Sequence, residues 1–402
     1  MIVGVIGGGA SGMAAALAAA ENPGVQVLLF ERQSRVGRKL QATGNGRCNL
    51  SNLNSGMEHY HGEDAAFGVH AIESFGVSDT LAWFRDLGLV TVAESSGRVY
   101  PYSDQANSVV DVLRFALEKP NIQVLTGCEV SKVRKTGDTF AVTAGEKTYS
   151  CHKLIIACGG LAGTKLGGSM SGYKLLAKFG HHSTRLRPAL VQVKCGWGGV
   201  TALKSVRANC TAQVLCDGVP HAQSTGELQF TEYGLSGPVI FEVSRDVCTG
   251  GNWTCRLDFL PQMEINELAA LLRMTARALL PVEELLTGIL HNRLGRVLTR
   301  SAGIRSGLIG ELSDDEIDAV CRAVKSFELE LTEPLGMDSA QVTAGGVLTS
   351  EFDPQTMESR LVKGLYACGE VLDIDGDCGG YNLQWAWSSG RVAGLSAGKE
   401  PS

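Results

Sequence analysis

The chain has 402 residues, of which 44% are hydrophobic and 19% charged, and its formal net charge is -6. This length exceeds the roughly 250 to 300 residues at which one hydrophobic core stops growing, so two or three domains are expected. The composition is that of a folded protein, and the lack of a dense Lys/Arg block argues against nucleic acid or anionic lipid as the main partner.

The 12 cysteines are scattered and form no C-x-x-C pair, which favours reduced thiols in a cytosol over a disulfide framework. The apolar start from Met1 to Ala20 has no basic leader, and glycines interrupt it. No later apolar run reaches the roughly 18 residues that a membrane helix needs. We therefore expect a cytoplasmic protein without a membrane partner.

The N-terminal segment has the pattern of a strand, a tight glycine turn and a helix. Ile2 to Ile6 is an apolar run rich in β-branched residues, and an alanine-rich segment follows the turn. In G-x-G-x-x-G the first glycine permits the turn, the second lets a pyrophosphate approach the backbone, and the third lets the helix pack on the strand. The residues expected to hold a dinucleotide at this turn are Gly7, Gly9, Ala10, Ser11 and Gly12.

A second strand, Val25 to Phe30, ends in Glu31, whose carboxylate can accept the hydroxyl protons of an adenosine ribose. The N-terminus of the preceding helix offers N–H groups and a positive dipole end to the phosphates. Together these features predict a dinucleotide site, with FAD and NAD both open at this point.

Several further stretches carry a family resemblance. They are Glu31-Arg32, Val36–Leu40, Ala42–Asn52, Gly97–Ser103, Phe230–Pro238, Gln341–Val347, Gly364–Glu370 and Asp377–Trp387. These stretches closely resemble the YhiN/BaiN-type flavoproteins, also called the aminoacetone oxidase family, over nearly the whole chain. The resemblance implies that the dinucleotide is FAD and not NAD. It also implies a Rossmann-like α/β fold of the glutathione-reductase type.

The resemblance also implies roles in FAD binding. Thr43 to Asn49 would supply backbone donors, Glu370 would bind the ribityl hydroxyls, and Val130 would hold the adenine through its backbone. A helix beginning near Tyr381 would point its N–H groups at the flavin N1/O2 edge. The alternative for Thr43 to Asn49 is a flexible surface loop. The further residues implied in FAD binding are Arg32, Arg38, Lys39, Thr43, Gly44, Asn45, Gly46, Arg47, Cys48, Asn49, Val130, Cys158, Gly159, Gly160, Gly369, Glu370, Gly380, Asn382 and Leu383.

The middle of the chain alternates between helical and extended patterns. Ser78 to Leu87 and Ser103 to Leu117 are expected to be helices, and Gln123 to Gly127 a strand. Glu129 to Ala157 alternates polar and apolar residues in three runs, as a small antiparallel meander does. Its last run is buried and leads into glycines.

From about Leu190 the pattern changes to that of an antiparallel sheet, because Ser205 to Leu215 alternates as a strand with one wet face. More strands are expected at Glu227 to Thr231 and Trp253 to Phe259. Gln262 to Ser326 has mostly helical spacing. We expect an FAD-binding domain of residues 1–189 and 341–402, an inserted β domain of 190–261 and 327–340, and a helical lobe of 262–326.

Three side chains are candidates for catalysis: Arg47 as a cation for a carbonyl or carboxylate, Tyr102 as an acid or base, and Asn382 for orientation. Alternatively, Arg47 binds only phosphate, Tyr102 packs beside Pro101, and Asn382 caps its helix. The family pattern commonly has histidine where this chain has Glu232, so an acid/base role for that histidine cannot be carried over. The histidines show no ligand spacing, and no metal is expected.

These features predict an FAD-dependent oxidoreductase that transfers hydride between flavin N5 and a small organic substrate. The reaction is either oxidation of an amine or α-amino ketone or reduction of an activated C=C bond. The alternatives are a flavin-dependent tRNA-modifying enzyme, which the acidic balance disfavours, and a non-catalytic redox sensor. No second G-x-G-x-x-G follows Ile155-Ile156. We therefore expect the electrons to come from the substrate itself or from a partner reductase, with transient docking of NAD(P)H in the substrate cavity as a further alternative.

Overall fold

The computed structural model describes residues 1–274 and 278–399. The chain forms two compact units, Met1–Arg187 with Gln341–Ser402 and Pro188–Ala340. In the second unit, strands and helices contribute to one hydrophobic core. The division of the chain into three domains stays a prediction.

The first unit is built on a five-stranded sheet with the order β20-β11-β1-β2-β7. All four pairings are parallel. Because the carboxyl ends of parallel strands meet at one edge of a sheet, the loops that follow these strands lie together. The strands are β1 (Ile2–Ile6), β2 (Gln26–Phe30), β7 (Ile122–Leu125), β11 (Lys153–Ile156) and β20 (Leu365–Ala367). This arrangement is the predicted Rossmann-like fold.

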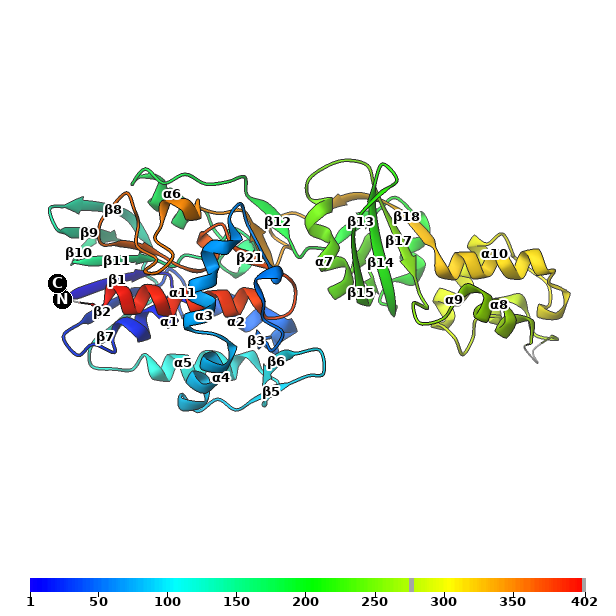
Figure 1. Cartoon of the computed structure of the whole chain (residues 1–402), viewed down its shortest axis with the longest axis horizontal. Coiled ribbons are helices and arrows are strands. Elements are labelled where there is room, and N and C mark those ends of the chain that lie inside the picture. The colour runs from blue at the N-terminus through cyan, green and yellow to red at the C-terminus, as the bar shows by residue number, and fades with distance from the viewer. Residues whose placement is uncertain (275–277, 400–402) are drawn as a thin grey trace. The chain divides into compact units, whose positions relative to one another are not determined.

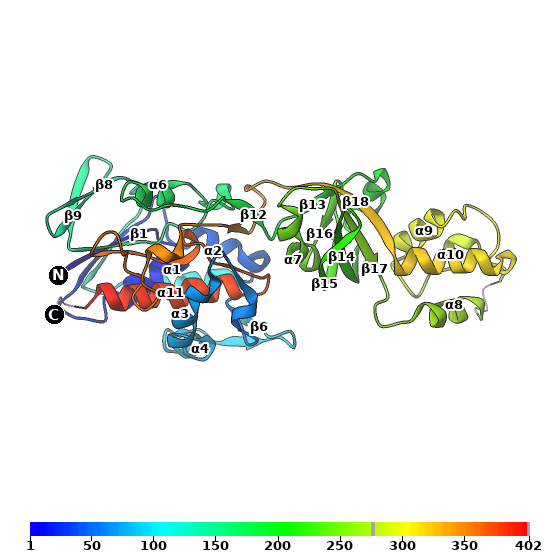
Figure 2. The ribbon, with the colours of Figure 1, turned by 45° about the horizontal axis from the view of Figure 1, so that its top comes forward.

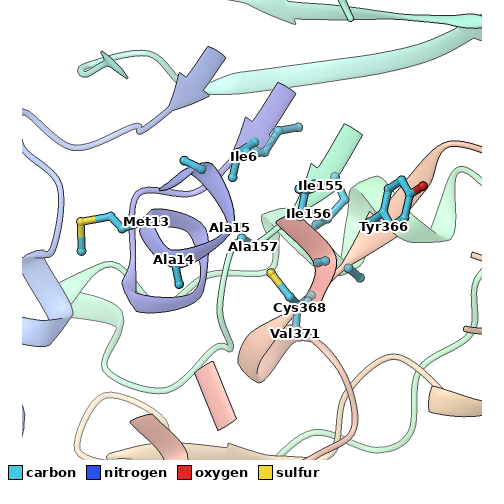
Figure 3. Packing of buried hydrophobic residues seen from close by; sticks show 14 of the residues in the cluster. Ile6, Met13, Ala14, Ala15, Ile155, Ile156, Ala157, Tyr366, Cys368 and Val371 are labelled. Carbon is cyan, nitrogen blue, oxygen red and sulfur yellow. The ribbon is translucent and has the colours of Figure 1, made fainter. Parts of the chain in front are cut away.

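Helix α1 (Ala10–Ala19) packs on this sheet through small side chains. Figure 3 shows Ala15 of α1 close to Ala157, the residue that follows β11. Most residues of these strands are apolar and buried, as expected for a parallel sheet that is covered on both faces. The core of the first unit therefore lies directly beneath the turn from β1 to α1.

Helix α11 (Tyr381–Ala397) lies alongside α1 (Figures 1 and 2). A Cβ atom on Gly390 would lie 2.4 Å from the carbonyl oxygen of Ser11, and one on Gly394 would lie 2.3 Å from that of Ala15. No larger residue fits at either position. The two glycines therefore bring the backbones of helices from the two ends of the chain into direct contact.

The other elements of the first unit surround the sheet. The helices are α2 (Arg38–Ala42), α3 (Val69–Ser74), α4 (Val77–Asp86), α5 (Ala106–Ala116) and α6 (Ser171–Ala177). The antiparallel meander consists of β8 (Val130–Thr136), β9 (Thr139–Ala144) and β10 (Lys147–Cys151). Two small sheets contain β3 (Ser51–Asn52), β5 (Thr91–Ala93) and β6 (Arg98–Pro101), and β4 (Tyr60–His61) and β21 (Asp375–Gly376). Strand β12 (Arg187–Ala189) lies where the chain leaves this unit, and β19 (Val342–Ala344) follows its return.

One helix start differs from the expectation. Helix α5 begins at Ala106 and not at Ser103, because Asp104 has a left-handed backbone with φ +56° and Gln105 is extended. A left-handed residue cannot be part of a right-handed helix. The chain therefore turns once before this helix starts.

The second unit contains a closed six-stranded barrel with the order β13-β16-β15-β14-β17-β18. Alternate side chains of β14 point inward, and Cys210, Ala212 and Val214 are fully buried, as the pattern predicted. The expected strand Glu227 to Thr231 is the end of a longer strand, because a left-handed turn at Asp217 and Gly218 joins it to β14 as a hairpin. The strands are β13 (Val193–Cys195), β14 (Arg207–Cys216), β15 (Val219–Phe230), β16 (Gly234–Ser236), β17 (Trp253–Asp258) and β18 (Phe327–Pro334).

Among the described residues of this unit, four α-helices accompany the barrel. Helix α7 lies in the segment expected to be purely β, and it starts directly after Gly237 with proline in its first turn. The remaining three fall in the segment predicted to be helical. The helices are α7 (Pro238–Val247), α8 (Ile265–Arg273), α9 (Asn292–Ser301) and α10 (Asp314–Lys325). Among the helices that the structure describes, none is both long and apolar enough to cross a membrane.

Candidate functional site

The turn from β1 to α1 requires glycine at two positions because backbone atoms occupy the space of a side chain. A Cβ atom on Gly12 would lie 1.8 Å from the carbonyl oxygen of Gly7, and one on Gly7 would lie 2.3 Å from that of Ala157. Gly7 also has φ +112°, which favours glycine. The structure thus brings the end of β11 against the predicted dinucleotide turn.

Gly9 has a different environment. Among the described residues, no atom lies within 4 Å of a Cβ atom built on Gly9, and this N-cap residue has no side-chain capping bond. The first turn of α1, with Ala10 and Ser11, therefore presents its N–H groups and positive dipole end without a side chain in front of them. A helix N-terminus of this kind binds phosphate.

Glu31 lies directly after β2, and its carboxylate accepts hydrogen bonds from two backbone N–H groups. Its Oε2 accepts the N–H of Gly8 at 2.8 Å, and its Oε1 accepts the N–H of Gln33 at 2.7 Å. A carboxylate has further lone pairs, so a ribose hydroxyl can still donate to it. The N–H of Cys128 bonds to the carbonyl of Glu31 at 2.8 Å, which brings the segment leading to Val130 beside it.

Glu370 is held by three other segments of the first unit. Its Oε1 accepts the N–H of Thr343 at 2.9 Å, and its Oε2 pairs with Nζ of Lys39 at 2.9 Å. A Cβ atom on Gly160 would lie 2.4 Å from Oε1 of Glu370. The structure thus brings together Glu370, Lys39 and Gly160, three of the residues predicted to bind the cofactor. Thr343, which also accepts the N–H of Ala162, is a contact that the sequence analysis did not name.

The loops after β11 and β20 complete this edge of the sheet. Gly369 has φ +76°, and its Cβ position lies 2.5 Å from Oγ of Ser11 in the first turn of α1. Gly159 is a second open point, because no described atom lies within 4 Å of its Cβ position. Burial raises the pKa of Cys158 to about 12, so its thiol remains protonated at neutral pH.

The loop from Thr43 to Asn49 has an unusual backbone. Gly44, Asn45, Gly46 and Cys48 have φ values of +58°, +56°, +86° and +63°. The N–H of Arg47 bonds to the carbonyl of Gly44 at 3.1 Å, so not every N–H of the loop is available to a ligand. Burial raises the pKa of Cys48 to about 12.

The other predicted cofactor-binding side chains mainly bond to the protein itself. Arg32 donates to the carbonyl of Gly167 at 2.7 Å, and Arg38 donates to Oε1 of Gln33 at 2.7 Å. The hydroxyl of Thr43 donates to the backbone of α2 at 2.7 Å. These bonds join neighbouring segments of the first unit, and direct contacts of the three residues with FAD stay predictions.

An unsatisfied acceptor lies at the N-terminus of α11. Within the described parts of the chain, the buried Oδ1 of Asn49 has no hydrogen-bond partner. It lies 2.9 Å from the Cβ position of Gly380, the N-cap of α11. A buried acceptor without a donor costs about 1 to 3 kcal/mol, which a ligand N–H would remove. Leu383, in the first turn of α11, packs against the core.

Arg47 and Tyr102, two of the catalytic candidates, belong to the same part of the first unit. Arg47 pairs with Asp104 and, at 3.0 Å, with Glu94, and its guanidinium stacks 4.0 Å from the ring centre of Tyr100. The hydrogen bonds that Arg47 donates to the carboxylates of Asp104 and Glu94 raise the pKa of Arg47. Tyr102 is 74% exposed. Catalytic roles for both residues stay predictions.

Asn382, the third candidate, bonds to the backbone just before its own helix. Its Oδ1 accepts the N–H of Gly376 at 2.8 Å, and its Nδ2 donates to the carbonyls of Gly376 at 2.7 Å and Asp377 at 3.2 Å. Both ends of the amide are therefore engaged. In the second unit, Glu232 forms an exposed ion pair with Lys204 at 2.6 Å.

A cluster that sequence reasoning missed lies beside Asn382. Nδ1 of His59 lies 2.9 Å from Oδ2 of Asp377, and Nε2 of His61 lies 2.6 Å from Oδ1. The pair of histidines is visible in the sequence, but their partner is more than 300 positions away, and no local pattern links them. No group of three or more His, Cys, Asp or Glu residues able to hold a metal ion is found in the described ranges.

The arrangement fits a flavin dinucleotide. It combines an open helix N-terminus at Gly9, a carboxylate at the end of β2, a fixed carboxylate and ammonium at Glu370 and Lys39, and an unsatisfied acceptor at Asn49. Phosphates, ribose hydroxyls and a ring N–H are the groups that such partners bind.

Comparison with known proteins gives consistent matches over the full length. The model of the family described as "HI0933-like protein Rossmann domain" matches residues 1–396. A 3-dehydro-bile acid delta(4,6)-reductase from Clostridium scindens is 39% identical, over 99% of each chain. Ribosomal RNA dihydrouridine synthases are 31% identical in Escherichia coli, over 96% of this chain and 95% of the relative, and 28% identical in Haemophilus influenzae, over 98% of each.

Proposed function

The chain belongs to the HI0933-like family of FAD-dependent Rossmann oxidoreductases, and from this premise we propose that it reduces an activated C=C bond of a small organic substrate. The observation that carries this proposal is the 39% identity to a bile-acid reductase across both units of the chain. Formation of dihydrouridine also adds hydrogen across a conjugated C=C bond. Oxidation of an amine or α-amino ketone has no such support among these relatives.

Bound FAD would supply a hydride at flavin N5. The chain's own residues would hold and orient it: the first turn of α1 at the pyrophosphate, Glu31 at the ribose, and Glu370 with Lys39 at the ribityl hydroxyls. The N-terminus of α11 would place its positive dipole end at the ring edge that gains negative charge on reduction.

The elements after β11 support a weak interaction with nicotinamide cofactors. The chain continues from β11 into the short helix α6 and then the second unit, so the described elements there form no second βαβ repeat. We expect the dissociation constants of NADH and NADPH to exceed roughly 100 μM, which corresponds to less than about 5.5 kcal/mol of binding free energy. Stopped-flow reduction should depend linearly on their concentration. Saturation at low micromolar levels would contradict this.

The main test uses the purified protein after anaerobic reduction of its flavin. We would mix it with a steroid that has a C=C bond conjugated to a ketone, with the saturated ketone as control, and follow the flavin absorbance. Only the enone should reoxidise the flavin, with a product two hydrogen masses heavier. Reoxidation by oxygen alone, or reduction of the oxidised protein by an amine, would overturn the proposal.

A second candidate is reduction of a uridine in RNA. Helix α9 exposes Arg293, Arg296 and Arg300, whose spacing puts them on one face, and Arg296 pairs with Glu284 at 2.6 Å. Against this, residues 188–340 carry 13 Lys and Arg and 19 Asp and Glu. An acidic unit repels phosphate. The expectation of no nucleic acid partner is therefore a proposal here, since two relatives carry names that refer to ribosomal RNA.

One set of protein variants can distinguish the two candidate functions. A variant with Arg293, Arg296 and Arg300 all changed to Gln should reduce the enone at an unchanged rate. If RNA is the substrate, the unmodified protein should bind unmodified ribosomal RNA with strong salt dependence, and the triple variant should lose that binding. Salt-dependent RNA binding together with no turnover of the enone would favour the second candidate.

A further inference from the structure

We propose that His59, Asp377 and His61 form a proton-exchanging clamp on the loop that leads into α11, and that this clamp takes up protons when the bound flavin is reduced. The loop, called here the α11 entry loop, consists of residues 375–380. The inference rests on the proposed function, because it places the flavin at the N-terminus of α11.

The clamp holds the entry loop through side chains and backbone. Strand β4 pairs with strand β21, and this pairing puts Asp375 opposite His61. The N–H of Asp377 bonds to the carbonyl of His59 at 2.9 Å. The ring of His59 stacks on Tyr381, the first residue of α11, with 4.3 Å between ring centres and an angle of 21°. A change in charge at these rings therefore occurs in direct contact with the start of α11.

The hydrogen bonds determine where a proton can be added. A carboxylate only accepts hydrogen bonds, so the bonded nitrogens, Nδ1 of His59 and Nε2 of His61, carry the hydrogens. In neutral imidazoles this leaves a lone pair on Nε2 of His59 and on Nδ1 of His61. The two side chains are 29% and 32% exposed, so protons from water can reach them.

Asp377 is the charged partner of both rings. Burial alone would raise the pKa of Asp377, but hydrogen bonds from His61 and His59 outweigh it and hold the pKa below its ordinary value of 3.8. The carboxylate is therefore ionised at neutral pH. A carboxylate bonded to one ring nitrogen stabilises the imidazolium that forms when the other nitrogen binds a proton.

Other ionisable groups lie on the same segments. Asp375 is opposite His61, and the carboxylate of Asp373 accepts the N–H of Glu63 at 3.1 Å. Tyr381 lies against His59, and burial raises the pKa of Tyr60 above its ordinary value, so that phenol stays neutral. Arg98 is a cation at the entry loop, since its Nε lies 3.6 Å from the Cβ position of Gly379, but the charge bonded directly to both rings is the carboxylate of Asp377.

Reduction and protonation are linked because opposite charges attract. Negative charge gained at the flavin edge near α11 favours imidazolium in the clamp, and by reciprocity imidazolium favours reduction. The reductant supplies the electrons, and a proton from solvent adds to Nε2 of His59 or Nδ1 of His61. No substrate bond changes at the clamp, so these residues are positioning residues.

The test is the pH dependence of the flavin midpoint potential in the purified holoprotein, measured spectroelectrochemically from pH 5.5 to 8.5. The wild type is compared with H59Q/H61Q and with H182Q as a matched control. His182 also bonds a carboxylate, that of Glu351 at 2.7 Å, but is 76% exposed and part of another cluster. One linked proton adds about 30 mV per pH unit to the slope of a two-electron couple.

We expect the plot of midpoint potential against pH to be steeper over part of this range in both the wild type and H182Q. In H59Q/H61Q the slope there should be smaller by up to about 30 mV per pH unit. Equal slopes in all three proteins would overturn the inference while leaving the proposed function intact. Absence of flavin binding would instead defeat the proposed function. If the double variant does not fold, the histidine ring signals of the oxidised and reduced wild type are titrated by NMR. Titration midpoints of His59 and His61 that do not differ between the two redox states would equally overturn the inference.

Discussion

The two units of the chain use different contacts to fix their structure. In the unit of residues 1–187 and 341–402, key contacts join backbone to backbone at glycines such as Gly7 and Gly12. In the unit of residues 188–340, inward side chains such as Phe230 fill a barrel. Substitutions in the first unit should therefore act on backbone geometry and the cofactor. Substitutions of the buried side chains in the second should act on packing.

Gly12→Ala should have the largest effect. Its Cβ atom would lie 1.8 Å from the carbonyl oxygen of Gly7, and backbone cannot move aside as the end of a side chain can. We expect the unfolding free energy to fall by more than about 3 kcal/mol, the upper end of the range for overpacked cores. Flavin binding should be lost as well. Urea denaturation and the flavin content of the purified protein measure this. A variant with wild-type stability would contradict the packing described for this turn.

Phe230→Ala tests the other side of the comparison. The ring is fully buried in the barrel, 6.4 Å from that of Phe259 between ring centres. Its removal should cost about 3 to 5 kcal/mol of unfolding free energy. The dissociation constant of FAD should be unchanged under conditions where the variant is folded. A weaker FAD complex in the folded variant would break the proposed separation between the units.

Gly9→Ala separates the cofactor from the fold within the first unit. Gly9 has φ -82°, which alanine adopts readily, and no described atom lies near its Cβ position. The flavin-free protein should lose no more than about 1 kcal/mol of unfolding free energy, because alanine is a poorer N-cap residue than glycine. FAD should bind at least about tenfold more weakly, roughly 1.4 kcal/mol, because the methyl group occupies the phosphate approach. Unchanged FAD affinity would place the phosphates elsewhere.

Glu31→Gln should weaken FAD binding about as much as Gly9→Ala does. The exchange replaces one acceptor oxygen by an NH2 group that faces the N–H of Gly8 or Gln33, and it makes the bond to ribose neutral. We expect FAD affinity to fall by about 1 to 3 kcal/mol while the fold survives. Isothermal titration of the flavin-free protein measures it, with Glu333→Gln in the second unit as control. Equal affinities in both variants would show that Glu31 does not hold the ribose.

The sequence was sufficient for features that depend on short segments. The strand, the glycine turn and the acid at the end of the next strand are all local, so Gly7, Gly12 and Glu31 lie where the pattern predicted. The alternation in β14 likewise predicted which residues are buried, because side chains of a strand point to opposite faces in turn.

Contacts between distant segments could not be predicted in this way. The pair of Lys39 and Glu370 joins positions 331 residues apart, and Asp377 meets His61 across 316 residues. Such contacts depend on which strands become neighbours and in which register, and periodicity within one segment carries no information about either. The engagement of Asn382 with the loop before it was expected only in outline, as a cap.

The contact between α1 and α11 has a consequence for synthesis of the protein. Gly390 and Gly394 give α1 its packing partner, yet they leave the ribosome long after residues 188–340 are complete. Domains generally fold as units during translation. We therefore expect the inserted unit to fold on the nascent chain while the apolar faces of β1 and α1 are still exposed. A chaperone that binds short apolar segments would then associate with the N-terminal part of the chain until α11 is made, and FAD would be incorporated only after that.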